Sequence, residues 1–131
     1  MPTETRREVV QQAHRDLKDT QVAISIRDFN LWYDNGEFQA LKHITLDIPE
    51  KRATAFIGPS GCGKSTLLRT FDRMCDFVAG VKTEGSLELF GKPVFGLDAT
   101  SLRVQVGLVF QHPTPFPMSL RDHVLYGPSR L

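Results

Sequence analysis

The chain has 131 residues, of which 40% are hydrophobic and 24% are charged, and its formal net charge at pH 7 is +1. This is an ordinary globular composition with enough chain for one core, and the near-neutral charge argues against a nucleic-acid partner. No apolar run approaches the roughly 20 residues that span a bilayer, and two cysteines are too few for a disulfide framework, which favours a reducing compartment.

The N-terminal part of the chain changes character near residue 21. Residues 1–20 are polar with balanced charges, which predicts a tail and leaves a short surface helix as the alternative. From Val22 to Phe29, and again over 44–48, apolar and polar residues alternate as in half-buried strands. Asn35-Gly36 between them is a tight-turn signal, so we expect an antiparallel hairpin.

Residues 58–66 form the complete motif Gly-x-x-x-x-Gly-Lys-Ser of a phosphate-binding loop. Its glycines let successive backbone N–H groups turn inward to phosphate oxygens. Lys64 is expected to reach the β- and γ-phosphates, Ser65 to ligate magnesium, and Thr66 to begin a helix whose amides attract the anion. The predicted nucleotide-binding residues of the loop are Gly58, Pro59, Ser60, Gly61, Cys62, Gly63, Lys64, Ser65 and Thr66.

The segments on either side of the loop agree with this motif. Residues 53–57 are a short apolar, β-prone run, which predicts a buried strand. After the loop, apolar residues recur at helical spacing up to Cys75. The order of strand, loop and helix is the one that the motif requires.

The last third of the chain contains further short elements. Residues 86–90 predict a strand followed by a turn at 91–93, and the apolar run 106–110 predicts another strand ending at Gln111. Three prolines in residues 113–117 exclude helix and sheet interior. Ser119, with Asp122 three residues later, predicts a capped helix over 120–126.

These segments together resemble the N-terminal half of an ABC-transporter ATPase, and the resemblance covers residues 22–127. It is carried by the sequence from Phe56-Ile57-Gly58 to Leu67-Leu68-Arg69 and by Val109-Phe110-Gln111. It implies an α/β P-loop NTPase core with an N-terminal antiparallel β region. It also implies that residues 21–131 are the N-terminal part of an ABC nucleotide-binding domain whose C-terminal half is missing.

Within that family the chain is most similar to ATP-binding subunits of bacterial phosphate importers, through residues 54–57, 67–74 and 113–119. The resemblance implies an ATPase that uses ATP and Mg²⁺ to drive phosphate uptake, peripheral on the cytoplasmic face of the bacterial cell membrane. Its implied partners are membrane permease subunits, a second copy of the ATPase and, indirectly, a periplasmic or extracellular phosphate-binding protein. The alternatives are an ABC ATPase for an amino acid or another anion, and a non-catalytic nucleotide-binding fragment.

The resemblance also assigns roles to single residues. Gln111 would reach magnesium and the attacking water, and an amide suits this role because it donates and accepts without carrying charge. Tyr33 resembles the aromatic residue that stacks on adenine. Here the family's aromatic-Gly pair is opened to Tyr33-Asp34-Asn35-Gly36, so Trp32 or Phe38 could take the position instead.

Two other features have more than one interpretation. The Pro-rich stretch after Gln111 is either a docking surface for the permease or a loop folded onto its own domain. Cys62 is either an inert filler or a thiol that alkylating reagents modify and bound ATP protects.

Other parts of the family pattern do not occur before Leu131: the strand ending in Asp-Glu, the Leu-Ser-Gly-Gly-Gln-type signature and the later histidine. The chain is therefore expected to be part of a longer protein and to be inactive alone. A P-loop GTPase would need an Asp-x-x-Gly element, which we do not find. A small P-loop kinase would not explain the aromatic hairpin or Gln111.

Overall fold

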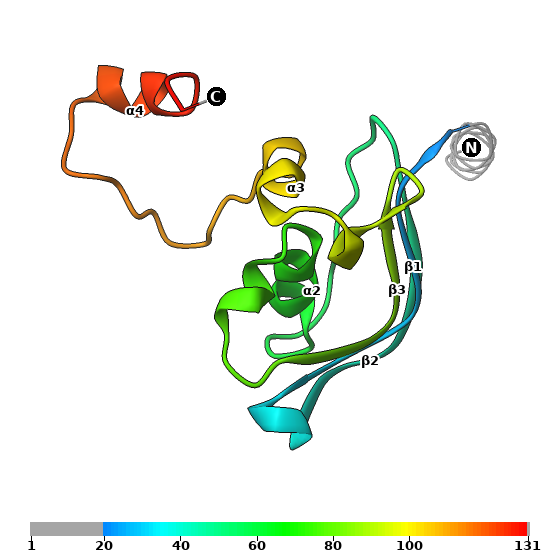
Figure 1. Cartoon of the computed structure of the whole chain (residues 1–131). Coiled ribbons are helices and arrows are strands. Elements are labelled where there is room, and N and C mark those ends of the chain that lie inside the picture. Colours follow the sequence, from blue (N-terminus) through cyan, green and yellow to red (C-terminus); the bar gives the residue numbers. More distant parts are fainter. Residues whose placement is uncertain (1–19, 131) are drawn as a thin grey trace, which may run out of the picture.

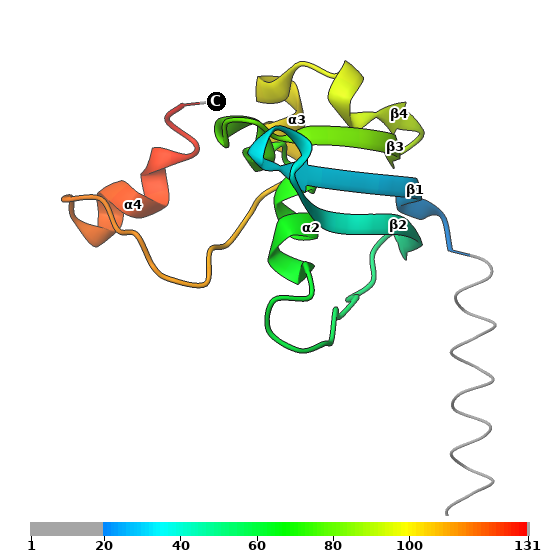
Figure 2. The same cartoon turned by 90° about the horizontal axis from the view of Figure 1, so that it is seen from below.

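The structure is a computed structural model that describes residues 20–130, so the predicted tail falls almost entirely outside the described part. Four antiparallel strands form one sheet in the order β2-β1-β3-β4. They are β1 (Val22–Tyr33), β2 (Phe38–Pro49), β3 (Lys82–Leu89) and the short β4 (Lys92–Pro93). The sheet curves around helix α2 in Figure 1, and Figure 2 shows the strands side by side.

The predicted hairpin is confirmed, and its strands run longer than the alternating pattern indicated. β1 and β2 pair antiparallel up to Tyr33 opposite Phe38, and a short 3₁₀ turn, Asp34–Gly36, joins them. The backbone N–H of Asn35 donates to the carbonyl of Gly80 at 2.9 Å. The tip of the hairpin is therefore tied to the loop that leads into β3.

A bulge in β1 bends the sheet. The strand register shifts between Ile26 and Phe29, and Asp28 within the bulge has a φ of +47°. The buried amide of Asn30 holds the bulge, because it donates to the Asp28 carbonyl at 2.8 Å and accepts from the His43 N–H at 2.9 Å. Bulges increase local twist, so this network accounts for part of the curvature.

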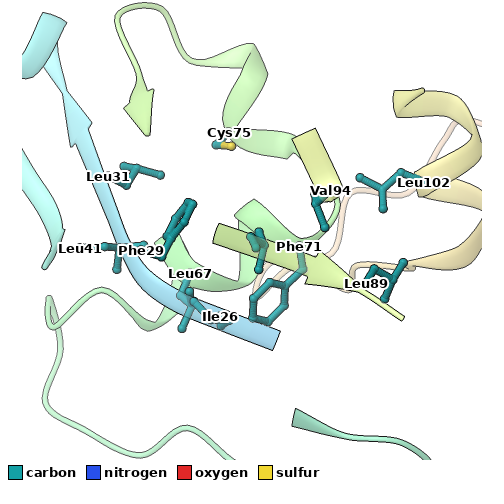
Figure 3. Close-up of a cluster of buried hydrophobic side chains, with 11 residues drawn as sticks. Ile26, Phe29, Leu31, Leu41, Leu67, Phe71, Cys75, Leu89, Val94 and Leu102 are labelled. Atoms are coloured by element: carbon teal, nitrogen blue, oxygen red, sulfur yellow. The ribbon is translucent and has the colours of Figure 1, made fainter. Parts of the chain in front are cut away.

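The core lies between the sheet and the helices that follow the loop. Helix α2 (Lys64–Phe71) and the 3₁₀ turn Met74–Phe77 place Leu67, Phe71 and Cys75 on the buried side, as their helical spacing predicted. Figure 3 shows this cluster packed against β1. Its buried members are Ile26, Phe29, Leu31, Leu41, Leu67, Phe71, Cys75, Leu87, Leu89, Val94 and Leu102.

The helix after the loop ends earlier than its apolar spacing suggested. Arg73 adopts a left-handed backbone with a φ of +60°, which separates α2 from the 3₁₀ turn. Helix α3 (Ala99–Gln105), which the sequence analysis missed, supplies Arg103 to this end. Its guanidinium donates to the carbonyls of Asp72 and Arg73 at 3.1 and 3.2 Å and so joins α3 to the end of α2.

The predicted strands over 53–57 and 106–110 are wrong. Both segments lack regular secondary structure and pair with none of the four strands of the sheet. The side chains of Ile57 and Val109 are 94% and 95% exposed. An apolar, β-prone run forms a strand only where a neighbouring strand completes its hydrogen bonds, and residues 20–130 offer these runs no such neighbour.

Two shorter predictions near the C-terminal end are confirmed. The strand predicted over 86–90 lies in β3, except for Phe90, and α4 spans Leu120–Tyr126 as expected. Ser119 caps α4 by accepting from the Asp122 N–H at 3.2 Å. The helix buries none of its residues and lies apart from the sheet in both views (Figures 1 and 2). No helix between residues 20 and 130 has the length and apolarity to cross a membrane.

Candidate functional site

One cavity of about 540 Å³ lies between the end of the hairpin and the phosphate-binding loop. The hairpin supplies an aromatic end, the loop and the start of α2 supply a polar end, and Gln111 approaches from the segment after α3. The cavity therefore brings together three parts of the chain that are far apart in the sequence. Its lining residues are Tyr33, Phe38, Gln39, Ala40, Ser60, Gly61, Gly63, Lys64, Ser65, Thr66 and Gln111.

Gly63 shapes the polar end of the cavity for two separate reasons. Its φ of +99° is left-handed, and it caps α2, where its carbonyl accepts from the Leu67 N–H at 2.9 Å. A Cβ at this position would also lie 2.9 Å from Leu41 Cδ2 and 3.2 Å from the Ala40 carbonyl. Only glycine lets the loop turn into the helix while lying this close to β2, so the first amides of α2 face the cavity.

The ammonium group of Lys64 is held by its own loop. Its Nζ atom donates to the carbonyls of Gly58 and Pro59 at 2.6 and 2.8 Å, and Cys62 Sγ lies 3.3 Å away. Gly58, Pro59 and Cys62 do not line the cavity, and they act here as the partners that position the lysine. A lysine carries three donors, so a phosphate oxygen can replace one of these acceptors without leaving the ammonium unsatisfied.

Ser65 and Gln111 line the same two hollows although 46 positions separate them in the sequence. Both line the main cavity, and both also line a smaller hollow of about 210 Å³ between α2 and residues 108–111. Their hydroxyl and amide oxygens are hard donors of the kind that Mg²⁺ accepts. Among residues 20–130, no three His, Cys, Asp or Glu side chains gather into a metal site. A magnesium ion held by these two residues would have to take its other ligands from phosphate and water.

The aromatic residues of the hairpin separate into two groups. Tyr33 and Phe38 line the cavity, whereas Trp32 lines a different hollow with Lys82 and Glu84. Trp32, one of the two alternatives to Tyr33, is therefore not at the cavity. The Tyr33 hydroxyl is within hydrogen-bonding distance of Thr66 Oγ1, at 3.3 Å. This contact joins the aromatic end of the cavity to its polar end.

The sequence analysis missed Gln39 and Ala40 as part of the cavity wall. Neither side chain carries chemistry that marks a site, so only their place in the hairpin could have indicated them. Alternation along a strand puts Phe38 and Ala40 on the same face. The sequence therefore indicated which residues share a face with Phe38. It could not indicate that this face forms a cavity wall, because that depends on where the phosphate-binding loop packs.

The Pro-rich segment contacts α4. The backbone N–H of Phe116 donates to His123 Nε2 at 3.1 Å. The centroids of the Phe116 and Tyr126 rings are 5.1 Å apart. Residues 112–120 are all exposed, including Phe116 and Met118 with 51% and 36% of their surfaces accessible. The segment and α4 thus form one small unit with an apolar surface.

The loop, the helix that it caps and the cavity beside it define a P-loop domain for nucleoside triphosphates. A family model described as "ABC transporter" matches residues 41–125, which is more than half of the chain. The chain therefore belongs to the ABC transporter family, as its motifs predicted, and this membership implies that it binds nucleotide.

Two curated relatives make the similarity more specific. The chain is 50% identical over 109 residues to the "Phosphate import ATP-binding protein PstB" of Mycoplasma capricolum subsp. capricolum, a match that covers 82% of this chain and 40% of that protein. It is 54% identical over 114 residues to "Phosphate import ATP-binding protein PstB 1" of Vibrio parahaemolyticus serotype O3:K6, covering 86% and 41% respectively. The chain thus spans about 40% of the length of the curated relatives that it matches.

Proposed function

We propose that this protein is the ATP-binding subunit of an ABC importer and couples ATP hydrolysis to the uptake of inorganic phosphate. The observation that carries the proposal is the cavity in which six residues of the phosphate loop, two aromatic residues and Gln111 meet. The names of the two relatives support ATP as the nucleotide and phosphate as the solute.

Each part of the cavity has a role in this proposal. The backbone amides of Gly63 to Thr66, which line the cavity, and the Lys64 ammonium hold the triphosphate, and the aromatic end takes the base. Mg²⁺, when bound, neutralises phosphate charge, and Ser65 and Gln111 are the residues that would hold it. Gln111 also orients the attacking water, because its amide can accept from water while its other end donates.

The proposal includes a setting and partners. Residues 21–131 are the N-terminal part of a nucleotide-binding domain, which works as a pair of ATPase subunits beneath two permease subunits at the cytoplasmic face of the bacterial cell membrane. A phosphate-binding protein outside the membrane delivers the solute. The apolar unit of residues 113–126 is the permease-docking surface in this proposal, because Phe116 and Met118 are exposed there.

The first test is ATP binding and turnover by the full-length protein with Lys64→Ala. Removal of a charge-assisted contact should lower the affinity for ATP about 10- to 100-fold. Hydrolysis should fall with it. Lys51→Ala is the matched control, because Lys51 is exposed, forms an ion pair with the neighbouring Glu50 at 3.6 Å and does not line the cavity. Unchanged affinity and turnover in the Lys64 variant would contradict the proposed function.

The solute needs a separate test. Phosphate uptake, measured with labelled phosphate in cells that depend on this protein, should fall when Lys64→Ala replaces the wild type. Uptake of an amino acid or sulfate instead of phosphate would leave the ATPase assignment intact and identify a different importer.

A further inference from the structure

His123 differs from every residue around it in the chain. In residues 111–130 it is the only one that is half-buried, and all the others are exposed. This stretch includes the apolar unit of residues 113–126, which lies apart from the sheet (Figures 1 and 2). A segment that packs on no core keeps its shape only through contacts of its own, so the contacts of His123 decide how the apolar unit is held.

The hydrogen bonds of the His123 ring fix its protonation state. Nδ1 lies 2.8 Å from the carbonyl oxygen of Ser119, which can only accept, so Nδ1 carries a proton. Nε2 accepts from the backbone N–H of Phe116 at 3.1 Å, so this nitrogen has none. The ring is therefore the neutral Nδ1–H tautomer. Neither the imidazolium nor the other neutral tautomer can make both bonds.

His123 is the residue of α4 that holds Phe116 on both its backbone and its ring. Besides the bond to the Phe116 N–H, the two rings stack with their centroids 6.3 Å apart. The Phe116 carbonyl in turn accepts from the N–H of Met118 at 2.8 Å. Phe116 and Met118 are the exposed apolar side chains of the proposed docking surface. The placement of that surface therefore depends on one bond to Nε2.

Charged groups of this region do not compensate for a charge on the ring. The Asp122 carboxylate accepts from Ser119 Oγ at 2.8 Å, and the Arg130 guanidinium lies over the Tyr126 ring, 5.2 Å from its centroid. Within residues 20–130, no carboxylate forms an ion pair with the His123 ring. A proton added to Nε2 would gain no acceptor there, and it would oppose the N–H group from which Nε2 now accepts.

We propose that His123 is the positioning residue of the apolar unit and acts only as the neutral Nδ1–H imidazole, so that protonation releases Phe116 and weakens docking to the permease. The proposal rests on the function proposed above for the docking step alone. Histidine changes its charge between about pH 5 and 8, so acidification of the surrounding solution is the signal to which this bond responds.

The first experiment tests the bond without any partner. Nitrogen NMR of the full-length protein labelled with ¹⁵N-histidine distinguishes the two neutral tautomers and the imidazolium, and His123→Gln identifies the His123 signals by their loss. At pH 8 the signals should be those of the Nδ1–H tautomer. At pH 5.5 they should become those of the imidazolium, and the Phe116 amide should lose its protection from hydrogen exchange after correction for the intrinsic rate.

The second experiment measures binding of the full-length protein to its permease subunits in detergent at pH 8 and pH 5.5. Wild-type affinity should fall about two- to tenfold at the lower pH, because one hydrogen bond is lost. His123→Gln should remove this pH dependence, since the glutamine oxygen can accept from Phe116 and does not titrate in this range. His123→Leu should bind about two- to tenfold more weakly at both pH values.

His112→Gln is the matched control, because His112 is exposed and makes neither of the two bonds. It should keep the pH dependence of the wild type. ATP affinity, compared with wild type at the same pH, should stay within about twofold in His123→Gln and His123→Leu, because His123 does not line the cavity.

Three results would overturn the proposal: the Nε2–H tautomer at pH 8, permease affinity equal at both pH values in the wild type, or a pH dependence that persists in His123→Gln. If the wild type binds ATP but no permease subunit at pH 8, the proposed docking function fails instead. The NMR result still decides whether His123 holds Phe116, so the two failures can be told apart.

Discussion

The Sγ atom of Cys62 lies 3.3 Å from the Nζ atom of Lys64 inside the phosphate-binding loop. Cys62 is exposed, whereas the other cysteine, Cys75, is only 3% exposed in the core. Any ligand held by Lys64 must therefore lie next to this exposed thiol. One loop therefore contains both the proposed phosphate contact and a chemical probe of its occupancy.

We expect N-ethylmaleimide to label Cys62 in the folded full-length protein and ATP with Mg²⁺ to slow this labelling. At an ATP concentration about ten times the dissociation constant, the rate should fall roughly tenfold. Peptide mapping by mass spectrometry measures the rate at each cysteine. Cys62→Ser is the control, and equal rates with and without ATP would rule out the protection.

Replacing Gln111 should separate binding from hydrolysis. Gln111→Ala is expected to keep ATP affinity within about threefold of wild type, because Lys64 and the loop amides remain. Turnover should fall at least about tenfold, because the Gln111 amide then no longer orients the attacking water. Steady-state phosphate release measures the turnover. Gln105→Ala is the matched control, because Gln105 is exposed on α3 and does not line the cavity; equal loss in both variants would contradict the role of Gln111.

Gly85 is predicted to be essential for the sheet. Its φ is +97°, and a Cβ at this position would lie 2.7 Å from the carbonyl carbon of Asp28 in the β1 bulge. Gly85→Ala should lower the free energy of unfolding by about 3 kcal/mol or more, since it adds a backbone clash to an unfavourable φ. Urea denaturation measures the change.

Gly91 provides the control for the backbone angle alone. It also has a positive φ, +77°, but a Cβ there would meet no atom within 4 Å. Gly91→Ala should therefore lose only about 1–2 kcal/mol. Equal losses in the two variants would show that the contact with Asp28 is unimportant.

The buried thiol of Cys75 should make stability depend on alkaline pH. Burial raises its pKa from the usual 9.0 to about 11. A group with a raised folded-state pKa stabilises the fold fully below pH 9, and this contribution is lost as the pH rises to about 11. The loss should amount to roughly 3 kcal/mol in total.

The comparison with Cys75→Ala isolates this contribution from other alkaline effects. The variant lacks the thiol and therefore lacks this pH-dependent contribution. Between pH 9 and 11 the unfolding free energy of the wild type should fall relative to that of the variant. Urea denaturation at several pH values measures it. A difference that stays constant over this range would show that Cys75 ionises as easily in the fold as in the unfolded chain.

Local sequence determined the elements whose hydrogen bonds are made nearby. Asn35-Gly36 between alternating runs was enough for the hairpin, because a tight turn and its two strands need no other part of the chain. Ser119 was likewise enough to begin α4, since the cap bonds to a residue three positions away. The loop motif predicted phosphate binding for the same reason: its glycines, lysine and serine act within nine consecutive residues.

Tertiary structure decided everything that depends on a distant partner. The runs 53–57 and 106–110 have the composition of strands, yet residues 20–130 supply no neighbour to pair with them, so composition alone misled. The pattern also could not show that Trp32 lines a different hollow while Phe38 lines the cavity, or that Gln111 lines the same cavity as Ser65. A sequence specifies which groups can bond locally, whereas the partners that meet across a cavity are fixed only when the sheet curves and the helix packs onto it.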